Sequence, residues 1–197
     1  MQHLIRLPHP RAVQQRVRAL ALLDALLLPD VRTRSFNYRS GWNDDEDLAF
    51  MYTPDHAKWF VLFANGKVLI KGVDPQHKMS ELDLPPFDDP QVREFWHTAP
   101  CDTLYSSFGF EYHDDYWQAL MQPVAGSLNL LDVWFVDPQA YACQLSERVG
   151  QPVSAEAVAH LFAGKAIRPS WLKQYFPQSG WQNQAADWLQ IDYPLAY

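Results

Sequence analysis

The pattern of hydrophobic and polar positions is clearest between residues 59 and 72, where two apolar runs flank Asn65-Gly66. Asn-Gly is the strongest short-range signal for a two-residue type I′ turn, because both residues tolerate positive φ. This turn sets the strand register, and the alternation of side chains then places five apolar residues on one face: Trp59, Val61, Phe63, Val68 and Ile70. The pattern predicts a β-hairpin whose apolar face lies on the core.

The opposite face of this hairpin is mixed, since Phe60, Leu62 and Leu69 share it with Lys67 and Lys71. Such a face is either half-solvated or partly covered by another element. The short helices predicted near the C-terminus need a surface on which to pack, so we expect them to cover this face.

The rest of the chain indicates a single α+β domain over residues 1–197. Apolar positions at helical spacing predict an N-terminal helix over 10–28. Strand-like runs concentrate in 34–113, and beside the hairpin they lie at 35–40, 48–53 and 103–113. Their short connections predict an antiparallel meander of about four to six strands.

Helix signals follow in the remaining segments. A short helix is expected at 91–98, and cap and stop residues predict a helical C-terminal third over 137–190. Its four helices are expected to begin after Asp137, Ser154, Pro169 and Gly180. Residues 126–136 are ambiguous between a buried strand and a short helix.

Composition and charge narrow the class of protein. The chain has 197 residues, is 48% hydrophobic and carries a net charge of −7. Residues 40–115 hold fifteen acidic residues against five basic ones. This acidic middle argues against nucleic-acid binding, which depends on Lys and Arg. No apolar run is long enough for a membrane span and no signal peptide is recognisable, so the cytoplasm is the expected location.

The densest charge run is Asp44, Asp45, Glu46 and Asp47, which follows Trp42. One interpretation is a solvated hairpin loop whose charges discourage pairing at the sheet edge. The other is an acidic and aromatic contact surface for a basic partner protein, which would steer association electrostatically. Calcium is a weaker third option, because the run lacks the ligand spacing of an EF-hand.

A second candidate polar site combines Asp24 with Glu111, His113 and Asp114. Asp24 falls on the apolar arc of the N-terminal helix, where it is either a buried structural carboxylate or a site carboxylate with a raised pKa. Glu111 and His113 share one strand face, as an exposed polar pair or as part of a metal or acid–base site. Neither interpretation is decided by the sequence.

Motifs for other chemistry are missing from the sequence. No zinc spacing, nucleophile elbow or phosphate-binding loop occurs, so we expect no metal and no cofactor. Cys101 and Cys143 belong to no C-x-x-C pattern, and two free thiols are favoured over a disulfide.

One resemblance extends over most of the chain. The stretch W-F-V-L-F-A-N-G-K-V-L-I-K-G-V-D, Asp137-Pro138 and the closing L-Q-I-D-Y-P resemble a family of uncharacterised soluble bacterial proteins of about this size. The shared motifs are structural, so the resemblance implies no catalytic residues. In general build the chain is also similar to small acidic immunity proteins of bacterial toxin systems.

These observations favour a non-enzymatic cytosolic interaction protein, with an immunity-type inhibitor of a basic toxin or nuclease as one form of it. The first alternative is an enzyme, such as a hydrolase, whose carboxylates and histidines converge from distant parts of the chain. The second is a structural subunit that forms a homo-oligomer through Leu22, Leu26 and exposed tryptophans.

Overall fold

The centre of the structure, a computed structural model, is an antiparallel sheet of six strands in the order β1-β2-β3-β4-β7-β8. The structure describes residues 7–64, 66–80, 84, 86–98, 100–180, 187 and 190–195. The strands are β1 (Phe36–Asn43), β2 (Glu46–Tyr52), β3 (Lys58–Ala64), β4 (Lys67–Val73), β7 (Phe108–His113) and β8 (Tyr116–Met121). The predicted α+β class and antiparallel sheet are confirmed.

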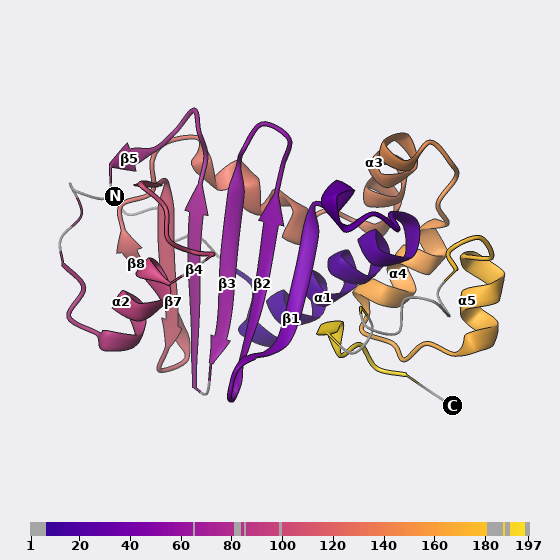
Figure 1. Ribbon diagram of the computed structural model, residues 1–197, viewed down its shortest axis with the longest axis horizontal. Coiled ribbons are helices and arrows are strands. Elements are labelled where there is room, and N and C mark those ends of the chain that lie inside the picture. The colour runs from indigo at the N-terminus through magenta and orange to yellow at the C-terminus, as the bar shows by residue number, and fades with distance from the viewer. Residues whose placement is uncertain are drawn as a thin grey trace.

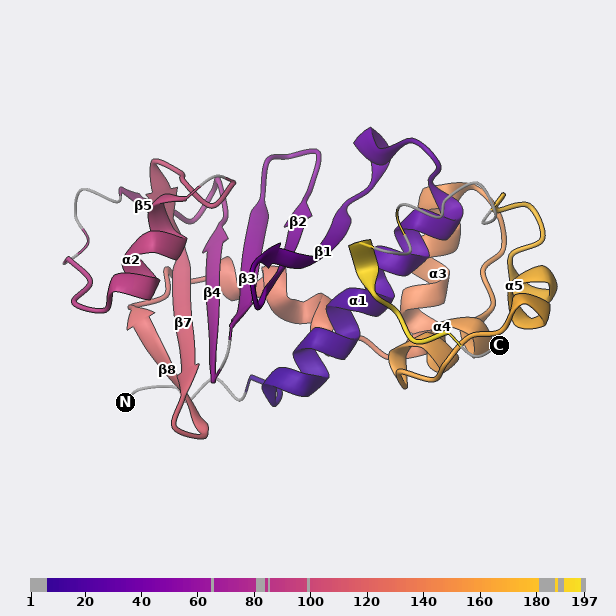
Figure 2. The ribbon, with the colours of Figure 1, turned by 60° about the horizontal axis from the view of Figure 1, so that its bottom comes forward.

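The helices lie on both faces and at one edge of this sheet. They are α1 (Pro10–Leu27), α2 (Pro90–His97), α3 (Pro138–Val149), α4 (Ala155–Phe162) and α5 (Pro169–Tyr175), with 3₁₀ helices η1 (Val31–Thr33) and η3 (Ser127–Trp134). Figure 1 shows α2 in front of the sheet and α1 and η3 behind it. In Figure 2, α3, α4 and α5 lie together beyond the β1 edge.

Several predicted boundaries change in the structure. The ambiguous segment 126–136 is the 3₁₀ helix η3, and the predicted strand 103–113 is divided between β7 and β6 (Tyr105–Ser106), which pairs with β5 (Met79–Ser80) in a separate ribbon. Strand β8 was not predicted, because Tyr116–Met121 does not alternate between apolar and polar residues. The helix expected at 181–189 falls almost entirely outside the described residues.

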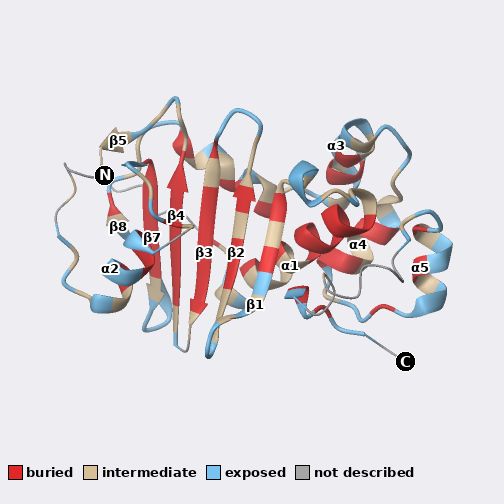
Figure 3. Cartoon of the chain, in the orientation of Figure 1, coloured by how far each residue is buried: buried red, intermediate tan, exposed pale blue. Residues whose placement is uncertain are grey.

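The hairpin β3–β4 has the register that the Asn-Gly turn predicts, with Val61 opposite Ile70 and Phe63 opposite Val68. Its turn residue Asn65 lies outside the described residues. The first, wholly apolar face packs with α1, η3 and the C-terminal helices in the larger of two core clusters. Figure 3 shows the buried middle of the sheet as continuous red strands.

The second face of the sheet is covered by α2, so the prediction that the C-terminal helices cover it is wrong. Val92, Phe95 and Trp96 of α2 pack on Leu62 and Leu69 in the smaller core cluster. The helix carries its own apolar stripe, which lets it cover the sheet although it is short. The C-terminal helices instead extend the core of the first face, where α1 supplies the surface they need.

Two features hold α2 in place. Lys71 of β4 has no exposed surface, and its Nζ donates to the carbonyl oxygens of Trp96 at 3.1 Å and Cys101 at 2.9 Å. A Cβ on Gly109 of β7 would lie 2.3 Å from the Trp96 ring, so only glycine leaves room for the indole. The end of α2 is therefore held against the neighbouring strands β4 and β7.

Helix α1 is buried on nearly all sides over its C-terminal half. Leu22 and Leu26 are 0% and 1% exposed, which explains why they depart from the helical pattern. They are core residues, so their own side chains offer no exposed apolar surface. Among the described helices, none has the length and apolar character to cross a membrane.

Candidate functional site

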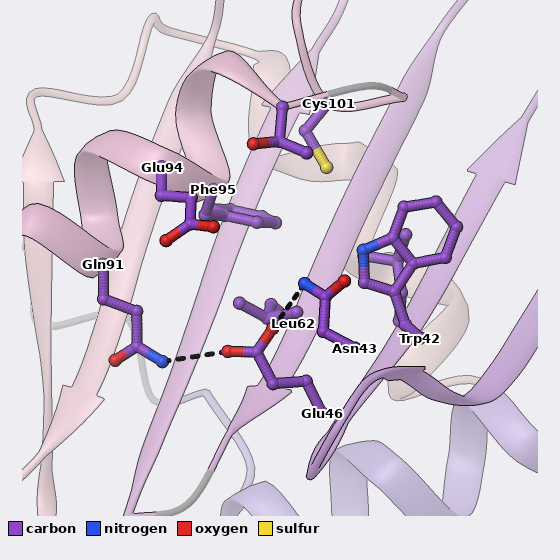
Figure 4. A pocket seen from close by; sticks show the side chains of 10 residues that line it. Trp42, Asn43, Glu46, Leu62, Gln91, Glu94, Phe95 and Cys101 are labelled. Carbon is purple, nitrogen blue, oxygen red and sulfur yellow. Dashed lines mark hydrogen bonds between the residues drawn. The ribbon is translucent and has the colours of Figure 1, made fainter.

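Three hollows surround the β1–β2 hairpin, which carries the acidic run. The first is a cavity of about 20 Å³, the size of a single water, between the hairpin and α2. Its lining is drawn in Figure 4 and comprises Trp42, Asn43, Glu46, Leu48, Leu62, Gln91, Glu94, Phe95, Thr98 and Cys101. Two wider, open hollows flank the same hairpin, and Asp45 borders both.

Glu46 joins the hairpin to α2. Its Oε2 accepts a hydrogen bond from Asn43 Nδ2 at 2.9 Å, and its Oε1 accepts one from Gln91 Nε2 at 3.1 Å (Figure 4). Both donors are neutral amides, so they fix the carboxylate without neutralising its charge. Glu94, one turn along α2 from Gln91, borders the same cavity.

The negative charge around this cavity lacks a basic counterpart. Asp44 and Asp45 are exposed at the tip of the hairpin, and Glu46 and Glu94 border the cavity. In the described part of the chain, none of these four carboxylates has a Lys, Arg or His nitrogen within 4.0 Å. Four acids from two elements therefore present their charge to solvent at one place.

Asp47 belongs to the same run but is used inside the fold. Its Oδ2 accepts from Tyr38 Oη at 2.6 Å, Gln14 Nε2 at 3.1 Å and Arg18 Nη2 at 3.1 Å, and its Oδ1 accepts from Gly41 N at 2.9 Å. Burial raises the pKa of Asp47, but these hydrogen bonds and the Arg18 charge outweigh it and leave the pKa below its ordinary value. Asp47 thus links α1, β1 and β2.

The aromatic strip consists of Trp42, Phe50 and Tyr52, which are half-buried on the second face of β1 and β2. Phe50 and Tyr52 meet edge-on with ring centroids 5.6 Å apart. The exposed guanidinium of Arg39 lies over Trp42 at 5.3 Å and over Phe50 at 5.9 Å. Trp42 belongs both to this strip and to the lining of the cavity.

Asp24 is a buried carboxylate with three partners. Arg148 of α3 pairs with its Oδ1, and the backbone N–H groups of Ser35 and Phe36 donate to its Oδ2 at 2.7 and 2.9 Å. Burial raises the pKa of Asp24, while Arg148 and the two amides act in the opposite direction. The contacts join α1, β1 and α3, which supports the structural interpretation of this residue.

Glu111 and His113 have separate surroundings although they share a strand. Glu111 is 6% exposed and pairs with Lys67 Nζ at 3.0 Å, and Lys67 also holds Asp89, the N-cap of α2, at 2.5 Å. His113 Nδ1 lies 3.2 Å from Oδ2 of the exposed Asp114 at the β7–β8 turn.

The structure thus does not bring Asp24, Glu111 and His113 together in one site. Asp24 belongs to α1 and its carboxylate is buried against β1 and α3, whereas Glu111 lies near the start of α2, to which Lys67 links it. Among the described residues, no group of three or more His, Cys, Asp or Glu is placed to hold a metal ion.

Sequence reasoning missed the second wall of the cavity. Gln91, Glu94 and Phe95 come from a helix that was predicted, but nothing local showed that it faces the acidic hairpin. The available signal was the polar side of that helix, where Gln91 and Glu94 are three residues apart and so share one helical face. The pairing itself is set by the tertiary fold, because Gln91 and its partner Glu46 are 45 positions apart in the sequence.

Comparisons with known proteins add no assignment. No protein-family model matches the chain, and neither a curated protein nor a solved structure matches it. The function must therefore be argued from the surface itself.

Proposed function

We propose that the protein is a non-enzymatic interaction module that binds a basic partner protein through the acidic hairpin surface. This surface consists of Trp42, Asp44, Asp45, Glu46 and Glu94. The observation that supports the proposal is the set of carboxylates without a basic counterpart, drawn from the β1–β2 hairpin and α2. Charge of one sign at one place raises the rate of encounter with an oppositely charged partner.

The proposal includes a compartment and a kind of partner. A cytoplasmic immunity-type inhibitor would meet a basic toxin or nuclease, whose substrate site is itself positively charged when it binds nucleic acid. An acidic surface that occupies such a site would block it. The rigid placement of Glu46 by two amide donors supports this idea, because a fixed carboxylate loses little freedom on binding.

The hydrolase alternative finds less support. None of the three hollows is lined by a described histidine. The two His–Asp pairs of the described chain, His77 with Asp74 and His113 with Asp114, belong to separate turns and to none of these hollows. The buried positions of Leu22 and Leu26 likewise weaken the oligomer alternative.

Paired charge-neutralising variants test the proposal. Asp44→Asn with Asp45→Asn removes two exposed charges from the β1–β2 turn. Asp114→Asn with Asp115→Asn removes two from the exposed β7–β8 turn and is the matched control. Both proteins are mixed with the products of neighbouring genes, and association is measured by calorimetry at two salt concentrations.

We expect the first double variant to bind the partner about three- to tenfold more weakly than the wild type, and the control to bind unchanged. Added salt should weaken wild-type binding more than binding of the first variant, because fewer charges remain to be screened. Equal binding by both double variants, or no association with any neighbouring product, would refute the proposal.

A further inference from the structure

The aromatic strip is a part of the second sheet face that no described helix covers. Register places Phe50 opposite Phe60 and Tyr52 opposite Lys58, so both side chains point to the face that α2 covers farther along the sheet. Figure 1 shows α2 in front of the β7–β8 end of the sheet, and β1 and β2 have no helix in front of them. Half-buried aromatic side chains with a neighbouring arginine are the composition enriched at protein interfaces.

The strip already holds one guanidinium, which shows the chemistry it accepts. Arg39 belongs to β1 and lies over two of the three rings, at distances within the roughly 6 Å range of a cation–π contact. A planar guanidinium stacks on aromatic faces and is less strongly hydrated than an ammonium group. The surface therefore favours arginine over lysine.

We infer that the aromatic strip receives an arginine side chain of the partner protein, stacked on Trp42 or Phe50 in the place where Arg39 now lies. The inference rests on the proposed function and specifies the residue of the partner that the surface recognises. The occupant follows from charge complementarity, because Trp42 also borders the cavity with the carboxylates of Glu46 and Glu94. An arginine on the strip is thus close to negative charge that lacks a basic counterpart.

Two other occupants fit less well. A second copy of this chain would bring its own acidic hairpin and a net charge of −7 to the same place, which repels. A strand added at the β1 edge meets a register shift between Arg39 and Asn43, with Gly41 at φ +62°. Such a bulge twists an edge strand away from further pairing.

Two labelled peptides serve as probes in the test: one alternates arginine with glycine, and the other has lysine in place of every arginine. Their binding to the full chain is measured by fluorescence anisotropy at low salt and at ~0.15 M salt. If charge alone attracts them, both peptides bind equally. If the strip stacks a guanidinium, the arginine peptide binds about two- to fivefold more tightly, and this ratio persists at the higher salt.

Variants of the chain assign the preference to the strip. Phe50→Leu keeps apolar bulk but removes a π-face, so the arginine-to-lysine ratio should fall toward one. Arg39→Gln removes the guanidinium that now lies on the strip. It should therefore raise the affinity for the arginine peptide more than the affinity for the lysine peptide. Lys58→Gln, which removes one positive charge from the same face of β3, should raise both affinities equally.

The outcomes separate the inference from the proposed function. A ratio near one in the wild type, no binding of either peptide, or equal gains in Arg39→Gln and Lys58→Gln would overturn the inference. None of these results bears on whether the neutralised Asp44 and Asp45 variant loses its partner. Loss of partner binding in that variant with no arginine preference would leave an acidic interaction surface that does not use the aromatic strip.

Discussion

Asp47 offers the sharpest test of how the acidic run divides between folding and binding. Its side chain is 19% exposed and accepts four hydrogen bonds, one of them from the Arg18 guanidinium. In D47N the amide oxygen can replace one carboxylate oxygen, but the amide nitrogen then faces a donor. The smallest loss occurs when the nitrogen faces Gly41 N–H and the oxygen keeps the three partners of Oδ2.

The magnitude follows from that count. A hydrogen bond to a charged group contributes about 1.5–3 kcal/mol, and removing the charge also weakens the contacts that remain. We therefore expect D47N to lower the free energy of unfolding by about 2 kcal/mol. D44N makes the same chemical change at an exposed turn position and should stay within about 0.5 kcal/mol of the wild type.

Urea unfolding followed by tryptophan fluorescence measures both variants, since the chain has eight tryptophans. An unchanged slope with urea would show that only the stability has moved. If D47N unfolds at the same urea concentration as D44N, the hydrogen bonds of Asp47 do not support the fold and the reasoning fails.

The effect should also depend on pH in a defined direction. The folded pKa of Asp47 is lowered, so its contribution is present above the unfolded value of ~3.9 and is lost as pH falls through the folded value. The stability difference between the wild type and D47N should therefore be largest near neutral pH. It should shrink below about pH 4, and a difference that grows on acidification would contradict this assignment.

Three further predictions concern other elements. K67M leaves the buried Glu111 without its cationic partner, with the neutral amide of Gln118 still donating to it, and should cost about 3 kcal/mol in urea unfolding. K67M with E111Q should recover part of this loss. Alkylation of the folded protein at neutral pH should label the exposed Cys143 and not Cys101, because Cys101 is buried and burial raises the pKa of its thiol to about 12. Mass spectrometry that finds Cys101 labelled before unfolding would count against this prediction. H56G should raise the thermal midpoint, by relief of about 1 kcal/mol of strain at φ +68°, whereas H56A should not.

Local patterns in the sequence were sufficient for the elements with strong periodicity or turn chemistry. The Asn-Gly turn determined the β3–β4 register, and Asp137-Pro138 marked the start of α3, where Asp137 Oδ1 accepts from the N–H groups of Gln139 and Ala140. These features depend on residues a few positions apart, so the information is contained in the local sequence. Strand β8 escaped detection because no such local alternation exists there.

The candidate site could be predicted only in part for the same reason. The acidic run and Trp42 were visible as a cluster in the sequence. The sequence did not show that Asp47 serves the fold while Asp44 and Asp45 stay exposed, because Asp47 is held by Gln14 and Arg18 from α1. It also did not show that α2 supplies the second wall of the cavity.

The sequence by itself determined the class of fold, the central hairpin and the excess of negative charge. Only the tertiary structure decided which charges remain exposed, because neutralisation of a carboxylate depends on bases brought near it from distant segments. It placed Lys67 beside Glu111 and Arg148 beside Asp24, but no described base beside Asp44, Asp45, Glu46 or Glu94. That difference in pairing, which is a matter of distance in space, separates the acidic hairpin surface from the buried acids Asp24 and Glu111.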